Sequence, residues 1–196
     1  MHSEQRNQVA STLAPGLLIA VPGMVDPFFS RAVVLLVEHD QEGAFGVILN
    51  RKAPVDLPTL LSGAGLSNAS VGDERSVWWG GPVQPESGMV LYLDEPHLGE
   101  YAPSQEVSPG LTCSWSMELL QEIAEGRGPS VFALFLGRSS WGPGQLESEL
   151  QTGSWLPADA ESSLLFTDDQ LECWLRALDA IGAAPATVVP GSPAEA

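Results

Sequence analysis

Positive charge is scarce in this sequence. Its 8 Lys and Arg residues stand against 25 Asp and Glu residues, which gives a formal net charge of −17. Lys52 is the single lysine, and only Arg51 and Lys52 place two basic side chains together. An acidic surface repels phosphate backbones instead of releasing their counterions. The composition therefore disfavours direct nucleic-acid binding and leaves a small molecule or another protein as the expected partner.

Long apolar runs and cysteine pairs are also lacking. No apolar run reaches the roughly eighteen residues that a membrane-spanning helix needs. Residues 1–18 lack the basic start and apolar centre of a secretory signal. Cys113 and Cys173 lie far apart without CxxC spacing, as is typical of reduced, partly buried thiols. We therefore expect a cytoplasmic protein with no membrane attachment.

The motifs of common cofactor, metal and hydrolase sites are absent as well. The sequence contains neither a GxxxxGK[ST] phosphate loop nor a GxGxxG dinucleotide fingerprint. It also has no HExxH or HxxxH zinc pattern and no GxSxG nucleophile elbow. We expect no cofactor and no bound metal, and no motif defines a reaction.

The sequence does contain enough apolar residues for a sizeable core. The chain has 196 residues, of which 44% are hydrophobic, and this size is typical of one domain. We expect a loose N-terminal segment at 1–12, a single folded domain at 13–182 and a disordered tail rich in Ala, Pro and Gly at 183–196.

Short apolar runs between turn residues predict the strands. Residues 17–21 are expected to form a strand, residues 32–50 a β-hairpin and residues 77–93 a second hairpin-like unit. The polar stretch 94–109 is expected to be a long surface loop with one short strand near its end. Helices are predicted after three capping residues, Asp56, Ser114 and Thr167.

The stretch 130–155 contains three elements in immediate succession. Residues 131–137 form an apolar run of strand length, residues 138–144 are typical of a glycine-rich turn, and residues 145–150 have a helical pattern. Pro143 suits the first helical position because its missing N–H is not needed there. A strand that leads through a tight turn into a helix often binds ligands, so we expect a site here.

Several motifs that together resemble one protein family follow one another along the chain. They are Met24–Phe29 (MVDPFF), Glu38–His39 with Gly43, Ala44 and Gly46, Asn50–Arg51, Gly80–Val83 (GGPV), and Trp141–Glu147 (WGPGQLE) with Trp155. The chain is similar to the YqgE/AlgH family of small bacterial proteins, described as transcriptional regulators, from about residue 13 to residue 178. The resemblance implies an α+β fold with a bent, partly barrel-like mixed β-sheet flanked by about four helices in a single domain. It implies no established enzymatic activity.

The sequence departs from the family pattern at four positions. The resemblance implies a tyrosine and a glycine before the tryptophan, where this chain has Arg138 and Ser140. It implies a proline after the Asn-Arg pair, where Lys52 stands, and a histidine after the GGPV segment, where Tyr92 stands. Any mechanism that needs that tyrosine or histidine is therefore in question here.

His39 invites a catalytic hypothesis because Glu38 and Asp40 flank it at a predicted strand end. A carboxylate partner orients an imidazole and raises its pKa. A hydrolase could use Ser139 or Ser140 with His39 and an acid, although the elbow motif is missing. A structural histidine is the alternative. Spacing argues against a metal site because neighbours along a strand point to opposite faces.

The turn at 138–144 is a second candidate. Its backbone N–H groups could meet an anion at the helix start, with Arg138 supplying charge and Trp141 a ring for stacking. The alternative is a tightly packed turn that binds no ligand. The glycines at Gly80–Gly81 are likewise compatible with either a ligand-binding turn or a packed one. Asn50 and Arg51 are expected to pair with internal carboxylates such as Asp26 or Glu38 rather than to bind phosphate.

Our hypothesis is a non-enzymatic cytoplasmic protein that binds a small ligand or a protein partner and acts indirectly on transcription. The alternative is a small-molecule hydrolase or transferase that uses His39 with Asp26 or Glu38. The expected site is a polar hollow shared by the loops of Asp26 and His39 and the 137–147 turn. No catalytic residue is assigned, and the expected ligand contacts are Asp26, Glu38, His39, Asn50, Arg51, Arg138, Trp141, Gly142, Gly144 and Gln145.

Overall fold

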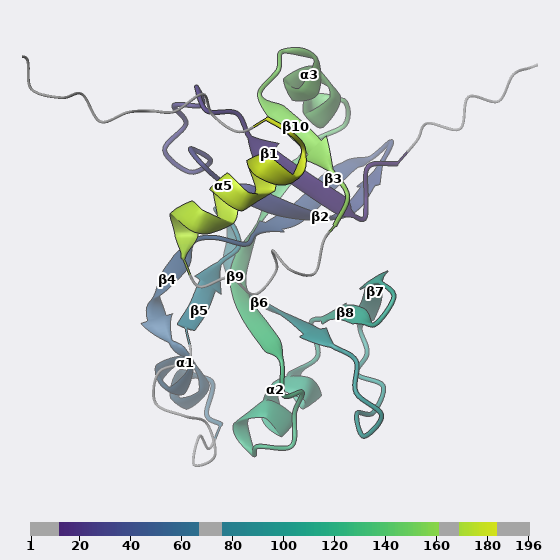
Figure 1. The fold of residues 1–196 in the computed structure, drawn as a ribbon. Coiled ribbons are helices and arrows are strands. Elements are labelled where there is room, and N and C mark those ends of the chain that lie inside the picture. The colour runs from purple at the N-terminus through teal and green to yellow at the C-terminus, as the bar shows by residue number, and fades with distance from the viewer. Residues whose placement is uncertain (1–11, 67–75, 161–168, 184–196) are drawn as a thin grey trace, which may run out of the picture.

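The computed structural model describes residues 12–66, 76–160 and 169–183. Nearly all of the expected N-terminal segment and C-terminal tail lies outside the described residues, as does Thr167. The described ranges form ten strands and four helices. Figure 1 shows α3 at one end of the molecule and α1 with α2 at the other, with β9 running between the two ends.

Eight strands follow one another across a curled sheet, and β4 and β5 attach beside β9. The order is β10-β1-β2-β3-β9-β6-β8-β7, and β5 joins β9 in parallel whereas the other pairs are antiparallel. The expected bent, mixed sheet in a single α+β domain is confirmed. The strands are β1 Gly16–Ala20, β2 Val33–Asp40, β3 Gly43–Ile48, β4 Lys52–Asp56, β5 Ser76–Trp79, β6 Val83–Leu93, β7 Ser104–Ser108, β8 Leu111–Ser114, β9 Phe132–Trp141 and β10 Trp155–Ala158.

The first strands of the sheet are covered on both faces. All residues of β1 and the first five of β2 are buried, as the unbroken apolar runs of their sequences predict. Strands β2 and β3 pair from Val34 with Ile48 to Asp40 with Gly43. The β-hairpin predicted at 32–50 is therefore confirmed.

Strand β9 contains a bulge at Gly137. This residue has a φ of +68°, and the pairing of β9 with β6 shifts register opposite it, between Val83 and Gly88. A Cβ atom at Gly137 would lie 2.3 Å from the carbonyl oxygen of Gly81, so the two backbones can approach only without that side chain. The Gly-Gly pair of the GGPV motif therefore serves a close backbone crossing.

The bulge reverses which side chains of β9 face the inner side of the sheet. Before Gly137, Phe135 points into the core that the sheet forms with α5, whereas Leu134 faces the core under α1 and α2. Beyond Gly137, Trp141 faces outward into the core under α3. Arg138 now lies on the inner side, over the ring of Phe45. One strand therefore contributes to all three cores.

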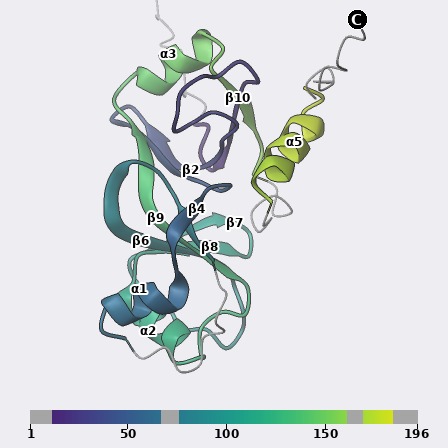
Figure 2. The same ribbon diagram turned by 90° about the vertical axis from the view of Figure 1, so that its left-hand side faces the viewer.

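Four helices cover these cores. They are α1 Leu57–Gly63, α2 Met117–Ala124, α3 Gln145–Gln151 and α5 Gln170–Ala180. Figure 2 shows α5 standing along one face of the sheet, apart from the other helices. Its Trp174 indole donates a 2.8 Å hydrogen bond to the Ala20 carbonyl oxygen, which fixes α5 to β1.

The predicted helices exist, but three of their starts were placed wrongly. Asp56 caps α1 as expected, since its side chain accepts from the Thr59 N–H. The cap of α2 is Ser116 and not Ser114, whose hydroxyl instead donates to the carbonyls of Tyr101 and Pro103. The cap of α5 is Asp169. Pro143 precedes Gly144, the cap of α3, so it does not occupy the first helical position.

Three strand predictions were also wrong. Residues 138–141 continue β9 instead of forming a turn, because the bulge at Gly137 lets the strand resume pairing with β3. Strands β5 and β6 do not pair with each other, since both lie against β9. The one short strand expected at about 107–112, near the end of the 94–109 loop, is two strands, β7 and β8, which form a hairpin. Alternation alone does not say which strands become neighbours.

Candidate functional site

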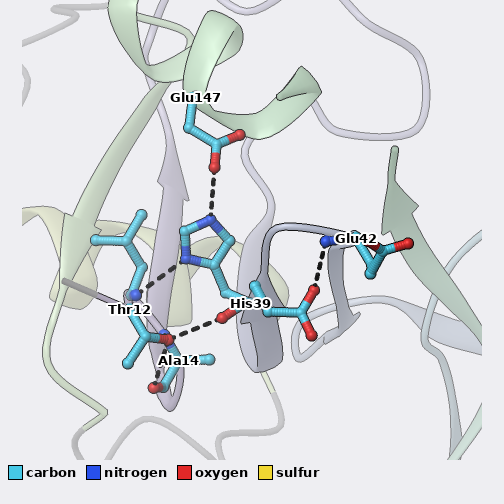
Figure 3. A network of polar contacts seen from close by, with 7 residues as sticks. Thr12, Ala14, His39, Glu42 and Glu147 are labelled. Atoms are coloured by element: carbon cyan, nitrogen blue, oxygen red, sulfur yellow. Dashed lines mark hydrogen bonds and ion pairs between the residues drawn. The ribbon is translucent and has the colours of Figure 1, made fainter. Parts of the chain in front are cut away.

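His39 lies at the end of β2 within a network of hydrogen bonds (Figure 3). Its Nε2 lies 3.0 Å from Oε1 of Glu147 in α3, and its Nδ1 accepts a 3.1 Å hydrogen bond from the Leu13 N–H. The hydroxyl of Thr12 donates to the His39 carbonyl oxygen at 3.0 Å. Because Nδ1 accepts, the neutral ring carries its proton on Nε2 and donates it to Glu147. His39 therefore joins the N-terminal segment, β2 and α3.

These contacts leave His39 poorly placed as a general base. A base needs a free lone pair within reach of the substrate proton, and the Nδ1 lone pair is directed at a backbone N–H. The His39 side chain is only 11% exposed. The pKa of Glu147 is lowered, first by a hydrogen bond from its own backbone N–H and second by the His39 ring. The pair is therefore arranged as a structural contact.

Asp26 organises its own loop. Its Oδ1 accepts from the N–H groups of Phe28 and Phe29, at 2.8 and 3.0 Å, which forms a tight turn. That turn places the Phe29 ring against the rings of Trp141 and Trp155, with centroids 6.2 and 5.4 Å away. The loop therefore does meet the end of β9, and the contact is aromatic packing.

Asn50 and Arg51 contact backbone carbonyls and not the expected carboxylates. Asn50 is 2% exposed; it accepts from the Val33 N–H and donates to the carbonyls of Arg31 and Gln170. The Arg51 guanidinium donates to the Ser30 carbonyl. Asn50 thereby fixes the start of α5 to the start of β2. The predicted pairing with Asp26 or Glu38 is wrong in the described part of the chain.

The WGPGQLE motif forms an internal network around Glu149. Oε2 of Glu149 accepts from the indole N–H groups of Trp141 and Trp155, at 2.9 and 2.8 Å. Its Oε1 accepts from the side-chain amide of Gln145 at 2.9 Å, and the amide oxygen of Gln145 accepts from the Gly142 N–H. The backbone N–H of Gly142, which we expected to bind an anion, is therefore already hydrogen-bonded to the Gln145 side chain.

A cleft lies on the other side of the end of β9. We call it the acidic cleft; its volume is about 340 Å³, and residues of the β2–β3 hairpin and β9 surround it. The carboxylates of Glu38, Asp40 and Glu42 are exposed on the hairpin side. Arg138 and Ser140 line the β9 side, because the bulge at Gly137 turns them to this face.

The Arg138 side chain at this cleft has a buried donor without an acceptor. Its Nε is buried and, among the residues that the structure describes, has no hydrogen-bond partner. The guanidinium lies 5.4 Å from the ring centroid of Phe45, a cation–π contact. No ion pair joins Arg138 to Glu38, Asp40 or Glu42. The cleft therefore combines exposed carboxylates, of which Asp40 accepts a hydrogen bond from the Glu42 N–H, with a donor that lacks an acceptor among the described residues and an aromatic wall.

The structure brings only some of the predicted site residues together. Glu38, Arg138 and Trp141 line the acidic cleft, whereas His39 faces α3. The cleft residues that sequence reasoning missed are Asp40, Glu42 and Phe45. The alternation of β2 and β3 would place Glu38 with Asp40 on one face, but no sequence pattern indicates that Arg138 rejoins them across the bulge.

Within residues 12–66, 76–160 and 169–183, no three His, Cys, Asp or Glu side chains are positioned to hold a metal ion together. None of the helices in those ranges is long and apolar enough to cross a membrane.

Comparison with known proteins shows what this fold and sequence belong to. The family described as AlgH-like matches residues 17–186. A UPF0301 protein of Myxococcus xanthus is 39% identical over 179 residues, which cover 91% of this chain and 96% of that protein. A UPF0301 protein of Xylella fastidiosa is 42% identical over 172 residues, covering 87% of this chain and 90% of the relative.

Two solved structures have the same fold. The solution structure of the AlgH protein from Pseudomonas aeruginosa superimposes with a TM-score of 0.73 at 32% identity, covering 95% of this chain and 97% of that one. The crystal structure of the protein DIP2367 from Corynebacterium diphtheriae gives a TM-score of 0.71 at 22% identity, covering 85% and 86%, and shows the fold alone. The chain belongs to the AlgH-like family, which confirms the resemblance seen in the sequence.

Proposed function

We propose that this protein works by binding and catalyses no reaction, and that its ligand occupies the acidic cleft. The observation that carries the proposal is the state of Arg138, whose buried Nε–H lacks an acceptor among the described residues while three exposed carboxylates stand across the cleft. A buried donor without a partner costs about 1–3 kcal/mol. A ligand oxygen that meets this N–H when the guanidinium moves toward the cleft would recover that loss.

The cleft selects for a ligand of mixed chemistry. Glu38, Asp40 and Glu42 favour a positively charged group. Arg138 favours a carbonyl or carboxylate oxygen, and the Phe45 ring offers an apolar surface. A ligand that carries an ammonium or guanidinium group on an aliphatic stem, together with a carbonyl oxygen, matches all three features, so amino-acid derivatives and peptides with basic side chains are the expected ligand class.

The alternative of a hydrolase or transferase that uses His39 receives less support from the geometry. Both ring nitrogens of His39 are engaged, and the Oδ1 atom of Asp26 holds its own turn. An effect on transcription would then be indirect, through the ligand or a partner protein, because the net charge of −17 opposes contact with DNA. A cytoplasmic location stays a prediction.

Tri-lysine tests the proposal because its ammonium groups and carbonyls match the cleft. A thermal-shift titration at low and moderate salt should raise the melting temperature of the wild-type protein, since a ligand at 100 times its Kd adds about 2.7 kcal/mol of stability. The double variant Glu38→Gln/Glu42→Gln should weaken the apparent affinity at least tenfold at both salt concentrations.

A matched variant separates the cleft from general charge. Glu100→Gln/Glu118→Gln removes two carboxylates that are equally exposed but lie outside the cleft, and it should leave the affinity unchanged. Equal weakening by the two double variants would contradict the proposal, because tri-lysine would then be held by net charge alone. Hydrolysis of p-nitrophenyl acetate above the buffer rate, abolished in His39→Gln, would contradict its non-enzymatic part.

A further inference from the structure

A hollow of ligand size also lies on the face of the sheet that α1 and α2 cover. Its volume is about 420 Å³, which is within the range of small-molecule sites. Residues of β6 and β9, of α1 and α2 and of the chain just before α2 line it. Figure 1 and Figure 2 both show α1 and α2 at the same end of the molecule, opposite α3. We call it the apolar hollow, after its lining residues Leu60, Met117, Leu120, Leu134 and Leu136.

The hollow is open because β6 has a glycine at Gly88. This residue pairs with Leu136 of β9, and cross-strand partners point to the same face of a sheet. A Cβ atom at Gly88 would lie 3.8 Å from Cδ1 of Leu134, which is an ordinary contact distance. The φ of Gly88 lies outside the left-handed region, so the backbone does not require glycine here. The missing side chain therefore leaves space over the leucines.

Apolar side chains around the hollow are incompletely covered. Leu60, Leu120 and Leu136 pack against the core under α1 and α2 but are only partly buried. Met117, at the start of α2, is 60% exposed although it is large and apolar. Covering apolar surface that is in contact with water is favourable, and a methionine side chain adapts to the shape of what it contacts. The hollow therefore favours a ligand with an apolar body.

The charge around the hollow selects the head group of such a ligand. Glu86 is the one charged side chain among the described residues that line it, and it is exposed. No basic side chain in the described part of the chain forms an ion pair with Glu86. The start of α2 does not call for an anion, because Oγ of Ser116 accepts from the Leu119 N–H and Glu118 lies in the first turn. A positively charged group is therefore the complement of this hollow.

We propose that the apolar hollow binds an amphiphilic amine, whose aliphatic chain covers the leucines and whose ammonium group pairs with Glu86. An ammonium group on an aliphatic stem can keep its charge at the mouth of a site while the stem covers apolar surface. Among the described residues, the apolar hollow and the acidic cleft have no lining residue in common. The inference therefore concerns a second site and does not rest on the proposed function.

Octylamine, octanoate and butylamine test the proposal on the ¹⁵N-labelled full chain at pH 7, where the amines are protonated and the acid is ionised. Shifts of the Gly88 and Leu120 amides during each titration give the affinity at the hollow itself. Octylamine should bind there at least tenfold more tightly than octanoate, which has the opposite charge, and than butylamine, whose chain covers less of the leucines. If octanoate binds as tightly as octylamine, the proposal is overturned, because Glu86 then does not select the head group.

Gly88→Val tests the position of the aliphatic chain. The added side chain would occupy the hollow at ordinary contact distance, and valine suits a strand, so octylamine should bind at least tenfold more weakly while the urea midpoint does not fall. Gly99→Val is the matched control, since Gly99 is exposed and its added Cβ atom would lie 3.9 Å from Cζ of Tyr101, outside the hollow. It should leave the affinity unchanged. Unchanged octylamine binding in Gly88→Val would contradict the proposed position of the chain.

Glu86→Gln tests the head group at an exposed position. The ratio of octylamine affinity to octanoate affinity should fall at least fivefold in this variant. Glu100→Gln removes another exposed carboxylate that lies outside the hollow, and it should leave the ratio unchanged. Equal changes in the two variants would overturn the proposal, because net charge alone would then attract the amine.

The outcomes separate this site from the acidic cleft. Octylamine shifts confined to residues 40–45 would place the amine in the acidic cleft, which contradicts this inference and leaves the proposed function standing. Octylamine shifts at Gly88 and Leu120, in a protein that binds no tri-lysine, would support this inference and contradict the proposed function.

Discussion

The two faces of the sheet at the end of β9 differ in how many of their polar side chains have hydrogen-bond partners. On the outer side, which we call the closed side, the indoles of Trp141 and Trp155 both donate to Glu149. On the inner side, which we call the open side, Arg138 has a buried Nε without a partner in the described chain and faces carboxylates that it does not contact. The polar groups of the closed side are satisfied from within, whereas the open side is where we propose that a ligand binds.

The two sides also differ in whether their residues match the family pattern that the sequence resemblance implies. The WGPGQLE motif, which carries much of the resemblance, supplies Trp141, Gly142 and Gln145 to the closed side. Arg138 and Ser140, which depart from the pattern, line the open side. The motif residues therefore stabilise the fold, whereas these two departures from the pattern that the resemblance implies lie at the cleft where we propose that a ligand binds.

The largest effect is expected from Glu149→Ala on the closed side. The change leaves two indole donors unsatisfied on tryptophans that are only 5% and 3% exposed. Unsatisfied buried donors cost about 1–3 kcal/mol each, so the free energy of unfolding should fall by about 3 kcal/mol in urea denaturation. Ser148→Ala, an exposed position in the same helix, should change it by less than about 0.5 kcal/mol. Similar small losses in both variants would remove the distinction between the sides.

A smaller effect is expected from His39→Ala. Loss of the ring removes the acceptor of the Leu13 N–H and the donor to Glu147, for about 1–2 kcal/mol. Hydrogen exchange of the Leu13 amide should accelerate more than that of amides in β6. His97→Ala is the matched control, because His97 is 58% exposed and pairs with Glu95 at the surface. If His97→Ala is as costly as His39→Ala, the His39 network has no special structural role.

The free energy of unfolding should fall less steeply with decreasing pH in Glu147→Gln than in the wild-type protein. The folded pKa of Glu147 lies below its ordinary value of 4.5 because of its own backbone N–H and, second, His39. A lowered carboxyl pKa adds stability at pH values above the unfolded pKa, and that contribution is lost as the pH falls through the folded pKa. Urea midpoints measured at pH 7, 5, 4 and 3 should therefore decline less in Glu147→Gln than in Ser148→Ala. Parallel curves would show that Glu147 does not contribute.

The smallest change in stability is expected on the open side, from Arg138→Met. The variant gives up a cation–π contact of about 0.5–1 kcal/mol but also removes a buried donor that has no partner. These effects oppose each other, so the free energy of unfolding should stay within about 0.5 kcal/mol of wild type in the same urea assay. A loss as large as that of Glu149→Ala would mean that Arg138 is a structural residue.

Sequence patterns predicted which residues form strands and helices better than they predicted which strands pair with each other. Apolar runs located β1, β2 and β3, and the motif order gave the family and its bent sheet, because these depend on local pattern and shared ancestry. The start of α2 was misplaced by two residues because Ser114 and Ser116 can both cap a helix, and only the contacts of Ser114 with Tyr101 and Pro103 decide between them.

The candidate site was harder to predict for a related reason. Glu38 and Arg138 were both named from the sequence, but their shared cleft depends on the bulge at Gly137, which reverses the alternation of β9. A glycine in an apolar run does not by itself indicate a bulge. The need for glycine at position 137 comes from its contact with Gly81, which lies on a distant segment of the chain. Sequence reasoning therefore found participants in the site but not the geometry that joins them.

Chemical-shift mapping of tri-lysine on the ¹⁵N-labelled protein tests the central claim most directly. The account predicts that the shifting amides belong to Glu38, residues 40–45 and residues 137–141, and that the same shifts occur in His39→Gln. Shifts centred on Leu13, His39 and Glu147, or shifts that disappear in His39→Gln, would place the ligand on the closed side and contradict the account.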